Sequence, residues 1–236
     1  MVSPTSTPKE VIRAITFDVG GTLIEPWPSV GHIYCEIAAQ HGYSNLLPAD
    51  VSEHFFRAWK CRAAFDYSRP AWADLVKQTF RQLIREPPDE AFFEALYHRF
   101  ENPQVWRIYD DVRPALICLK KHGIKLGIIS NWDDRLRPLL RQLELEHYFD
   151  IVIISCEIGA TKPSPIVFRE AAQLLRLPVD SILHVGDSPQ EDVRGASQSG
   201  FRCMLLNRGH PGEAPGEIRS LLDLHGVISQ AIANRK

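Results

Sequence analysis

The chain has 236 residues, of which 44% are hydrophobic and 24% are charged, and this length and composition are typical of a globular protein with a well-buried core. Its formal net charge of −2 gives no long-range attraction for nucleic acid or an anionic membrane, so the composition argues against both as partners. The five cysteines include no Cys-x-x-Cys pair, which argues against a disulfide framework or a zinc site. No apolar run reaches the roughly 18 residues of a membrane span. We therefore expect a cytoplasmic protein.

The first part of the chain predicts one strand followed by helices. Residues 1–10 are rich in Ser, Thr and Pro, and we expect them to form a disordered leader. The apolar run over residues 11–17 predicts a strand that ends at Asp18 and opens into a Gly-Gly-Thr turn. From Ser29 onward the apolar residues recur at helical spacing, and prolines at positions 48, 70 and 87–88 mark the starts of three further helices. Four consecutive helices without a strand predict a small helical bundle.

After Pro103 the pattern alternates between helices and strands. Continuous apolar runs predict strands over residues 124–130, 151–155, 181–185 and 201–206. Helical spacing predicts helices over residues 112–122, 135–143, 166–175 and 193–199, then a helix over 216–224 and a terminal segment over 227–233. Strands this apolar, alternating with helices, indicate a parallel sheet covered by helices on both faces.

The helical bundle therefore interrupts an α/β fold, because it separates the first strand from the others. We predict an α/β core made of residues 11–24 and 105–236, with a helical cap domain inserted at residues 25–104. Inserted lids of this kind often close over an active site.

Polar residues follow four of the predicted strands where each one ends. They are Asp18, the pair Ser130 and Asn131, Lys162, and the acids at 187 and 192. Since the carboxyl ends of parallel strands share one edge of the sheet, we expect these groups to converge. Three carboxylates favour a hard cation such as Mg²⁺, while a hydroxyl and an ammonium suit an anion. Together they suit phosphoryl transfer through an aspartyl intermediate.

Four segments resemble the motifs of the haloacid dehalogenase-like (HAD) superfamily, in the family's order. They are residues 17–23, 129–131, 162–163 and 186–192, and the resemblance covers residues 11 to about 210. It implies a Rossmann-like core with helices on both faces, and the insertion after the first motif matches the subgroup with a cap at that place. It also implies Mg²⁺-dependent hydrolysis of a small phosphate ester; the sequence leaves the substrate, the pathway and the oligomeric state open.

The resemblance also implies a metal site. Asp18 would be the nucleophile and a Mg²⁺ ligand, and the backbone carbonyl of Gly20 would be a second metal contact. Asp187 would bind Mg²⁺ directly, and Asp192 would bind it directly or through an intermediate group.

The transferred group would be held by the second and third motifs. Ser130 and Lys162 would contact it, and Lys162 would also orient Asp18. Asn131 would assist through its backbone amide, and we include Thr22 of the first motif among the substrate-binding residues.

One position departs from the family's pattern. Phosphatases of the family usually carry a second aspartate two residues after the nucleophile, as general acid and base, and this chain has Gly20 there. General acid–base catalysis raises the rate of a reaction by about 10²–10⁴-fold. Without it, hydrolysis of phosphate esters would be slow or would depend on good leaving groups. His32 and Glu25, just downstream, are candidate substitutes.

This departure leaves two alternatives to a phosphatase. One is a 2-haloacid dehalogenase, which attacks carbon without a metal and also lacks the second aspartate. The Gly-Asp pair at 186–187 argues against it, because such enzymes usually lack that pair. The other is a catalytically degenerate protein that binds a ligand or partner through its cap.

Other residues are expected to have ordinary structural places. Seven aromatic residues are expected to form the core of the cap, namely Phe55, Phe56, Trp59, Phe80, Phe92, Phe93 and Phe100. Arg135 and Arg137 are expected to be surface charges. His184 is expected to be a strand residue without a role as catalytic base. The loop 66–69 either faces the substrate or is exposed.

Overall fold

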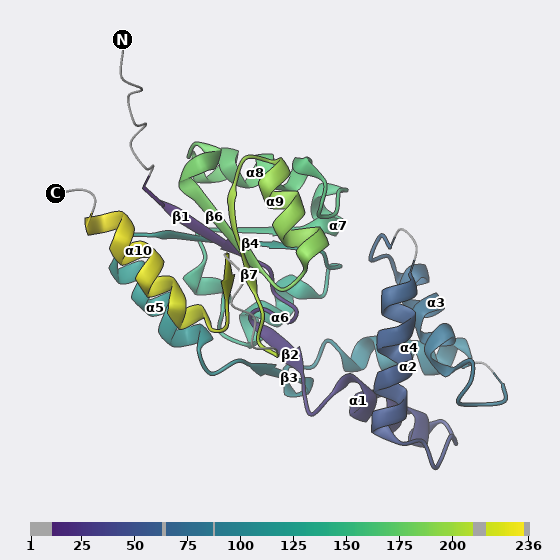
Figure 1. Ribbon diagram of the computed structural model, residues 1–236. Helices are drawn as coiled ribbons and strands as arrows, with labels where there is room; N and C mark the ends of the chain where they lie inside the picture. The colour runs from purple at the N-terminus through teal and green to yellow at the C-terminus, as the bar shows by residue number, and fades with distance from the viewer. Residues whose placement is uncertain (1–10, 63–64, 87, 210–215, 234–236) are drawn as a thin grey trace, which may run out of the picture.

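A computed structural model describes residues 11–62, 65–86, 88–209 and 216–233, and it places a β-sheet with flanking helices beside a second group of helices (Figure 1). The leader predicted at residues 1–10 lies outside the described residues.

The sheet has six strands, and every neighbouring pair is parallel. In spatial order they are β5 (Ile151–Ile154), β4 (Lys125–Ser130), β1 (Ala14–Phe17), β6 (Ile182–Gly186), β7 (Arg202–Leu206) and β8 (Glu217–Ile218). Phe17 at the end of β1 lies opposite Ile128 of β4 and Val185 of β6. The carboxyl ends of these three strands therefore lie next to one another.

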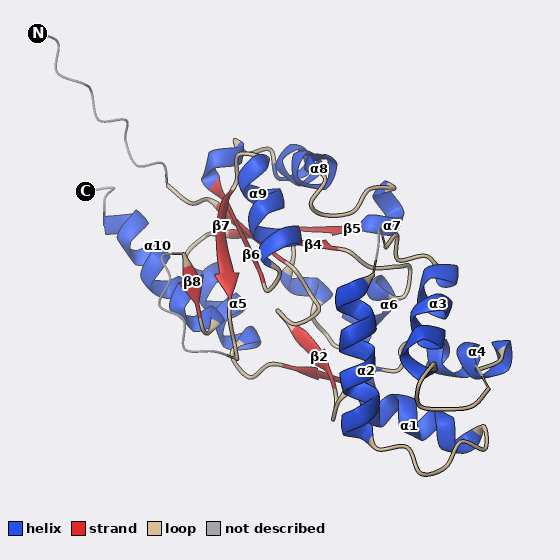
Figure 2. Cartoon of the chain, turned by 45° about the vertical axis from the view of Figure 1, so that its right-hand side comes forward, coloured by secondary structure: helices blue, strands red, loops and turns tan. Residues whose placement is uncertain are grey.

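Helices cover both faces of the sheet, as predicted (Figure 2). One face packs against α5 (Val112–Lys121), α6 (Leu136–Gln142) and α10 (Leu224–Ala233). The other face packs against α7 (Ser155–Ile158), α8 (Pro165–Leu175) and α9 (Gly195–Gln198). Alternation along the strands explains the two layers, since Ile128 joins the first hydrophobic cluster and Ile129 the second.

Four helices lie between β1 and β4 in the chain, and we call them the helical insertion. They are α1 (Val30–Gln40), α2 (Pro48–Cys61), α3 (Arg69–Phe80) and α4 (Glu90–Arg99). Ser29 caps α1, because its hydroxyl accepts from the amide of His32, and Asp89 caps α4 in the same way. The insertion has a hydrophobic cluster of its own, separate from the two clusters on the sheet.

A short ribbon joins the insertion to the sheet, and the sequence did not predict it. Strand β2 (Ile24–Pro26) pairs antiparallel with β3 (Trp106–Ile108), just before and just after the insertion. Proline at positions 26 and 28 is disfavoured inside regular strands and helices, so the local sequence does not favour a strand here. The partner strand lies more than 70 residues away, so no local pattern announces the pairing.

The prediction of a helix over residues 216–224 is wrong. That segment contains β8 and a single 3₁₀ turn (Leu221–Asp223), and α10 begins only at Leu224. Ser220 and Asp223 form a capping box that starts the turn, while β7 supplies backbone partners for β8. Similarly, a π-helical turn (Pro189–Arg194) precedes α9. Further 3₁₀ turns are Pro103–Val105, Glu146–Tyr148 and Val179–Ser181.

Candidate active site

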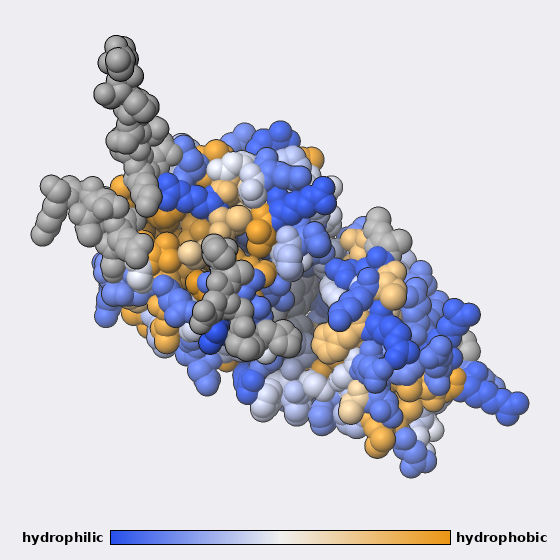
Figure 3. Space-filling model, viewed as in Figure 1, coloured by the Kyte–Doolittle hydropathy of each residue, from blue (hydrophilic) through white to orange (hydrophobic). Residues whose placement is uncertain are grey.

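A cavity of about 480 Å³ lies between the sheet edge and the helical insertion. Figure 3 shows the hollow between these two parts of the molecule. Six of the predicted site residues line it from the sheet edge, namely Asp18, Gly20, Ser130, Asn131, Asp187 and Asp192. The predicted convergence of strand ends is thus a feature of the structure.

Lys162 lies behind Asp18 as a buried ammonium between two carboxylates. Its Nζ is 2.7 Å from Oδ1 of Asp18 and 2.6 Å from Oδ1 of Asp192, and its side chain is only 1% exposed. Burial alone would lower the pKa of Lys162, but the two carboxylates raise it above its ordinary value. Asn131 holds the Lys162 backbone, since it accepts from the amide at 2.6 Å and donates to the carbonyl at 3.0 Å. The lysine is therefore charged and fixed.

Asp18 directs its carboxylate into the cavity with two donors on one oxygen. Besides Lys162, the hydroxyl of Ser130 donates to Oδ1 of Asp18 at 3.1 Å. Burial raises the pKa of Asp18, Lys162 opposes this effect, and the charge of Asp192 adds to it.

Asp187 and Asp192 complete a group of three carboxylates whose oxygen atoms lie within 4.8 Å of one another. Enclosure by the protein and the charges of Asp18 and Asp192 raise the pKa of Asp187 to about 7. Burial alone would also raise the pKa of Asp192, but Lys162 and His184 hold it well below its usual range.

The three carboxylates fit a divalent cation. They repel one another when ionised, and oxygen donors are the ligands that Mg²⁺ prefers. Two glycines give the acids room: a Cβ at Gly21 would collide with Asp187, and a Cβ at Gly186 would collide with Asp192. Gly20 lines the cavity beside Asp18, and metal contact by its carbonyl stays a prediction.

His184 on β6 contacts the carboxylate group through Asp192. Its side chain is fully buried, with Nε2 3.0 Å from Oδ1 of Asp192 and Nδ1 2.9 Å from the Thr16 hydroxyl. Burial lowers the pKa of His184. The residue lies on a strand, as predicted, and it fixes Asp192.

Thr22 does not line the cavity. Its side chain is fully buried, and its Oγ1 has no hydrogen-bond partner among the described residues. Its backbone carbonyl accepts from Arg208 at 2.8 Å. A substrate contact by Thr22 stays a prediction.

The two suggested substitutes for the missing acid differ in position. Glu25 lines the cavity but forms an ion pair with Arg107. His32 lies outside the lining, where its ring nitrogen is 2.8 Å from the Ser29 hydroxyl.

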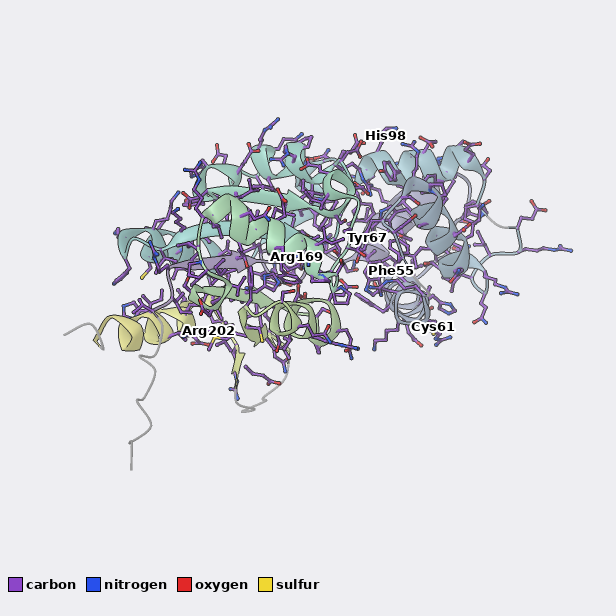
Figure 4. The ribbon with its side chains drawn as sticks, turned by 90° about the horizontal axis from the view of Figure 1, so that it is seen from above. Phe55, Cys61, Tyr67, His98, Arg169 and Arg202 are labelled. Atoms are coloured by element: carbon purple, nitrogen blue, oxygen red, sulfur yellow. The ribbon has the colours of Figure 1, made fainter. Side chains whose placement is uncertain are left out.

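Sequence reasoning missed Glu191, which links the sheet edge to the insertion. Its carboxylate accepts from Asn131 at 3.0 Å, from Arg62 at 3.0 Å and from the Tyr67 hydroxyl at 3.4 Å. Tyr67 and Phe55, seen from above in Figure 4, lie where the insertion meets the core. The signal available was the place of Glu191 beside Asp192 in the fourth motif.

The expectation that Arg135 is a surface charge is wrong. Arg135 lines the cavity, pairs with Asp133 at 2.6 Å and lies 3.5 Å over the ring of Tyr97. Arg137 is partly exposed and pairs with Glu157, as expected of a surface charge.

The predicted aromatic core of the insertion divides into two groups. Phe80 and Phe92 are fully buried in the insertion, as predicted. Phe55, Phe56 and Trp59 line the cavity, and of these Phe55 also packs against the hydrophobic cluster of the insertion. No helix in the described parts of the chain is long and apolar enough to cross a membrane.

The chain is similar to known proteins over most of its length. The family profile described as haloacid dehalogenase-like hydrolase matches residues 12–200. The chain is 33% identical over 208 residues to haloacid dehalogenase-like hydrolase domain-containing protein 3 of Danio rerio, covering 84% of this chain and 86% of the relative. It is 36% identical over 213 residues to glyceraldehyde 3-phosphate phosphatase of Methanopyrus kandleri, covering 84% of this chain and 85% of the relative. The crystal structure of a HAD phosphatase from Thermococcus onnurineus aligns with a TM-score of 0.65 and 26% sequence identity. The alignment covers 92% of this chain and 97% of that structure.

Proposed function

The chain belongs to the haloacid dehalogenase-like hydrolases, and on that premise we propose that it is a Mg²⁺-dependent phosphatase that cleaves small phosphate monoesters through an aspartyl-phosphate on Asp18. The observation that carries the proposal is Asp18 itself, which faces the cavity with Lys162 and Ser130 on one oxygen and two further carboxylates beside it. Two relatives that are named phosphatases, for glyceraldehyde 3-phosphate and for phosphoserine, support the ester class.

In the first step, a carboxylate oxygen of Asp18 attacks phosphorus. The bond from phosphorus to the leaving oxygen breaks, and that oxygen keeps the electron pair. Lys162 and Ser130 hold Asp18 in line through their hydrogen bonds to its carboxylate. Both would also donate to the phosphoryl oxygens of a bound ester.

In the second step, water attacks phosphorus and the bond to Asp18 breaks, which releases phosphate and restores the carboxylate. Mg²⁺, when bound by Asp18, Asp187, Asp192 and the Gly20 carbonyl, would neutralise charge on the phosphoryl group. Asn131 keeps Lys162 in place throughout.

We further assign residues 25–104 as a cap that closes over the substrate and excludes water. Contacts from Arg62 and Tyr67 of this segment to Glu191 of the core support that role.

The test is phosphate release by the purified protein with Mg²⁺ varied. We expect wild type to hydrolyse a monoester such as 4-nitrophenyl phosphate only with the metal present. Asp18→Asn is expected to lower the rate of phosphate release at least about 10³-fold, because no nucleophile remains. Asp134→Asn, an exposed acid near the site, is the matched control and keeps activity.

Two other results would overturn the proposal. Chloride release from 2-chloropropionate without metal would make the chain a dehalogenase. No turnover of any phosphate ester above background would make it a binding protein.

A further inference from the structure

The walls of the cavity beyond the carboxylates are rich in aromatic side chains. Among the described residues that line it, 12 of 30 are aromatic, against 9% in the whole chain. The ring of Trp59 stacks nearly parallel with Phe55 and Trp72, at centroid distances of 6.1 and 5.8 Å. Trp106 and Trp132 meet at 5.3 Å in another part of the lining. Rings in such rows bind other flat rings well.

The cations in this lining are already neutralised. Within the described part of the chain, the lining holds two, Arg62 and Arg135. Arg62 pairs with Glu191 at 3.0 Å and lies 3.5 Å over the Trp59 ring. Arg135 has the equivalent arrangement with Asp133 and Tyr97. A leaving group with its own carboxylate or second phosphate would find no unpaired cation among these residues, whereas an uncharged ring needs none.

The chemistry of the missing acid points the same way. With glycine at position 20, no carboxyl follows the nucleophile to protonate the leaving oxygen, and the Trp132 ring lies beside that position. A phenolic oxygen has a pKa of about 10 and leaves without a proton far more readily than an aliphatic alkoxide.

We propose that this site takes aryl phosphates, meaning monoesters in which the phosphate is bonded directly to an uncharged aromatic or heteroaromatic ring. This inference rests on the proposed phosphatase function. The ring lies against the aromatic wall near Trp59, and the phosphate meets Asp18. When the phosphorus–oxygen bond breaks, the aryl oxygen leaves as phenolate. Water then attacks phosphorus and the bond to Asp18 breaks, which releases hydrogen phosphate and gives one proton to solvent. A cavity of about 480 Å³ has room for one or two fused rings and a phosphate.

Four phosphate substrates distinguish the effect of an aromatic ring on activity from the effect of a good leaving group. Phenyl phosphate has both features, 2-phenylethyl phosphate has only the ring, acetyl phosphate has only the good leaving group, and propyl phosphate has neither. We expect kcat/KM for phenyl phosphate to exceed that for each of the others by about tenfold or more. Phosphoserine, whose leaving group carries a carboxylate and an ammonium, is expected to be the poorest substrate.

Two variants test the wall itself. Trp59→Leu is expected to raise KM for phenyl phosphate about fivefold and to leave acetyl phosphate nearly unchanged. Trp27→Leu is the matched control, because Trp27 does not line the cavity. Phe56→Leu gives an independent reading with little risk to folding, since that ring is 53% exposed. Inhibition by phenylphosphonate against methylphosphonate measures the same preference in wild type.

The possible failures differ from one another. If propyl phosphate or phosphoserine is cleaved as well as phenyl phosphate, the aryl assignment is wrong and the phosphatase proposal stands. Equal effects of Trp59→Leu on phenyl and acetyl phosphate would also overturn it. If none of the esters releases phosphate with Mg²⁺ present, the proposed function itself fails.

Discussion

Gly20 decides how much acid catalysis the site can supply. Its backbone lies outside the left-handed region, so an aspartate could adopt the same conformation. A Cβ at this position would be 3.3 Å from the Trp132 ring, which is a tight contact. An acid at position 20 and the indole at 132 therefore compete for the same space.

We predict that Gly20→Asp alone raises kcat for propyl phosphate only slightly, whereas Gly20→Asp with Trp132→Ala raises it at least about tenfold. The double variant gives the acid room to donate a proton to the alkoxide, and the full benefit of such help is about 10²–10⁴-fold. Steady-state kinetics on the two variants, with Trp132→Ala as control, measures it. A single variant as active as the double variant would contradict the competition.

At the scale of single residues, the sequence predicted the polar groups at the strand ends but not those that join the two parts. Asp18 and Asp187 were visible because each follows an apolar run. Glu191 and Arg135 were not, because their partners Arg62 and Tyr97 lie far away in the chain. Such pairs exist only once the insertion has packed on the core.

Among the elements, α1 and α2 approach each other closely at Gly31. A Cβ there would collide with the carbonyl of Pro48 and the hydroxyl of Ser52, and that hydroxyl accepts from the Gly31 amide at 3.1 Å. The absence of a side chain lets the start of α1 touch the first turn of α2.

Gly31→Ala is therefore expected to destabilise the helical insertion by about 1–3 kcal/mol, the usual cost of overpacking. Hydrogen exchange should show faster opening in α1 and α2 than in the sheet strands. Gly226→Ala in α10 is the control, because a Cβ there meets open space and alanine favours a helix. Uniform exchange changes across the sheet would argue against this local origin.

Element prediction succeeded where a run was long and strongly patterned. The buried strands β4 and β6 and the helix starts at Pro48 and Asp89 carried clear local signals. The β2–β3 ribbon and β8 did not, because strands of two or three residues exist only through their partners.

For the whole molecule, one carboxylate ties distant parts together. Asp111, just before α5, accepts two hydrogen bonds from Arg208, at 2.9 and 3.0 Å, and one each from the Ser220 hydroxyl and the Leu221 amide, both at 2.8 Å. The same Arg208 donates to the carbonyl of Thr22 in the first motif. The turn after β1, the start of α5 and the segment after β8 thus share one centre.

This centre predicts a pH dependence of stability. Burial alone would raise the pKa of Asp111, but the donors from Arg208, Leu221 and Ser220 hold it below its ordinary value. The charged form is thus favoured on folding, so its contribution is complete above the unfolded pKa of about 3.9 and is lost as the pH falls through the lower folded pKa.

We expect Asp111→Asn to lower the free energy of unfolding by about 1–3 kcal/mol at pH 7 and by less below about pH 4. Urea denaturation at both pH values measures this, with the exposed neighbour Asp110→Asn as control. An equal loss at both pH values would mean that the charge of Asp111 does not matter.

The central place of β1 in the sheet has a consequence for synthesis on the ribosome. Its partners β4 and β6 lie more than 100 residues further along the chain, and the residue that completes the carboxylate group is Asp192. At about 5–20 residues per second, the nucleophile strand leaves the ribosome roughly ten seconds or more before that group is complete. The contacts of the helical insertion are local, so it can fold while β1 is still unpaired. A nascent chain that stalls before β4 would therefore carry a formed insertion, an unpaired apolar strand β1 and no catalytic site.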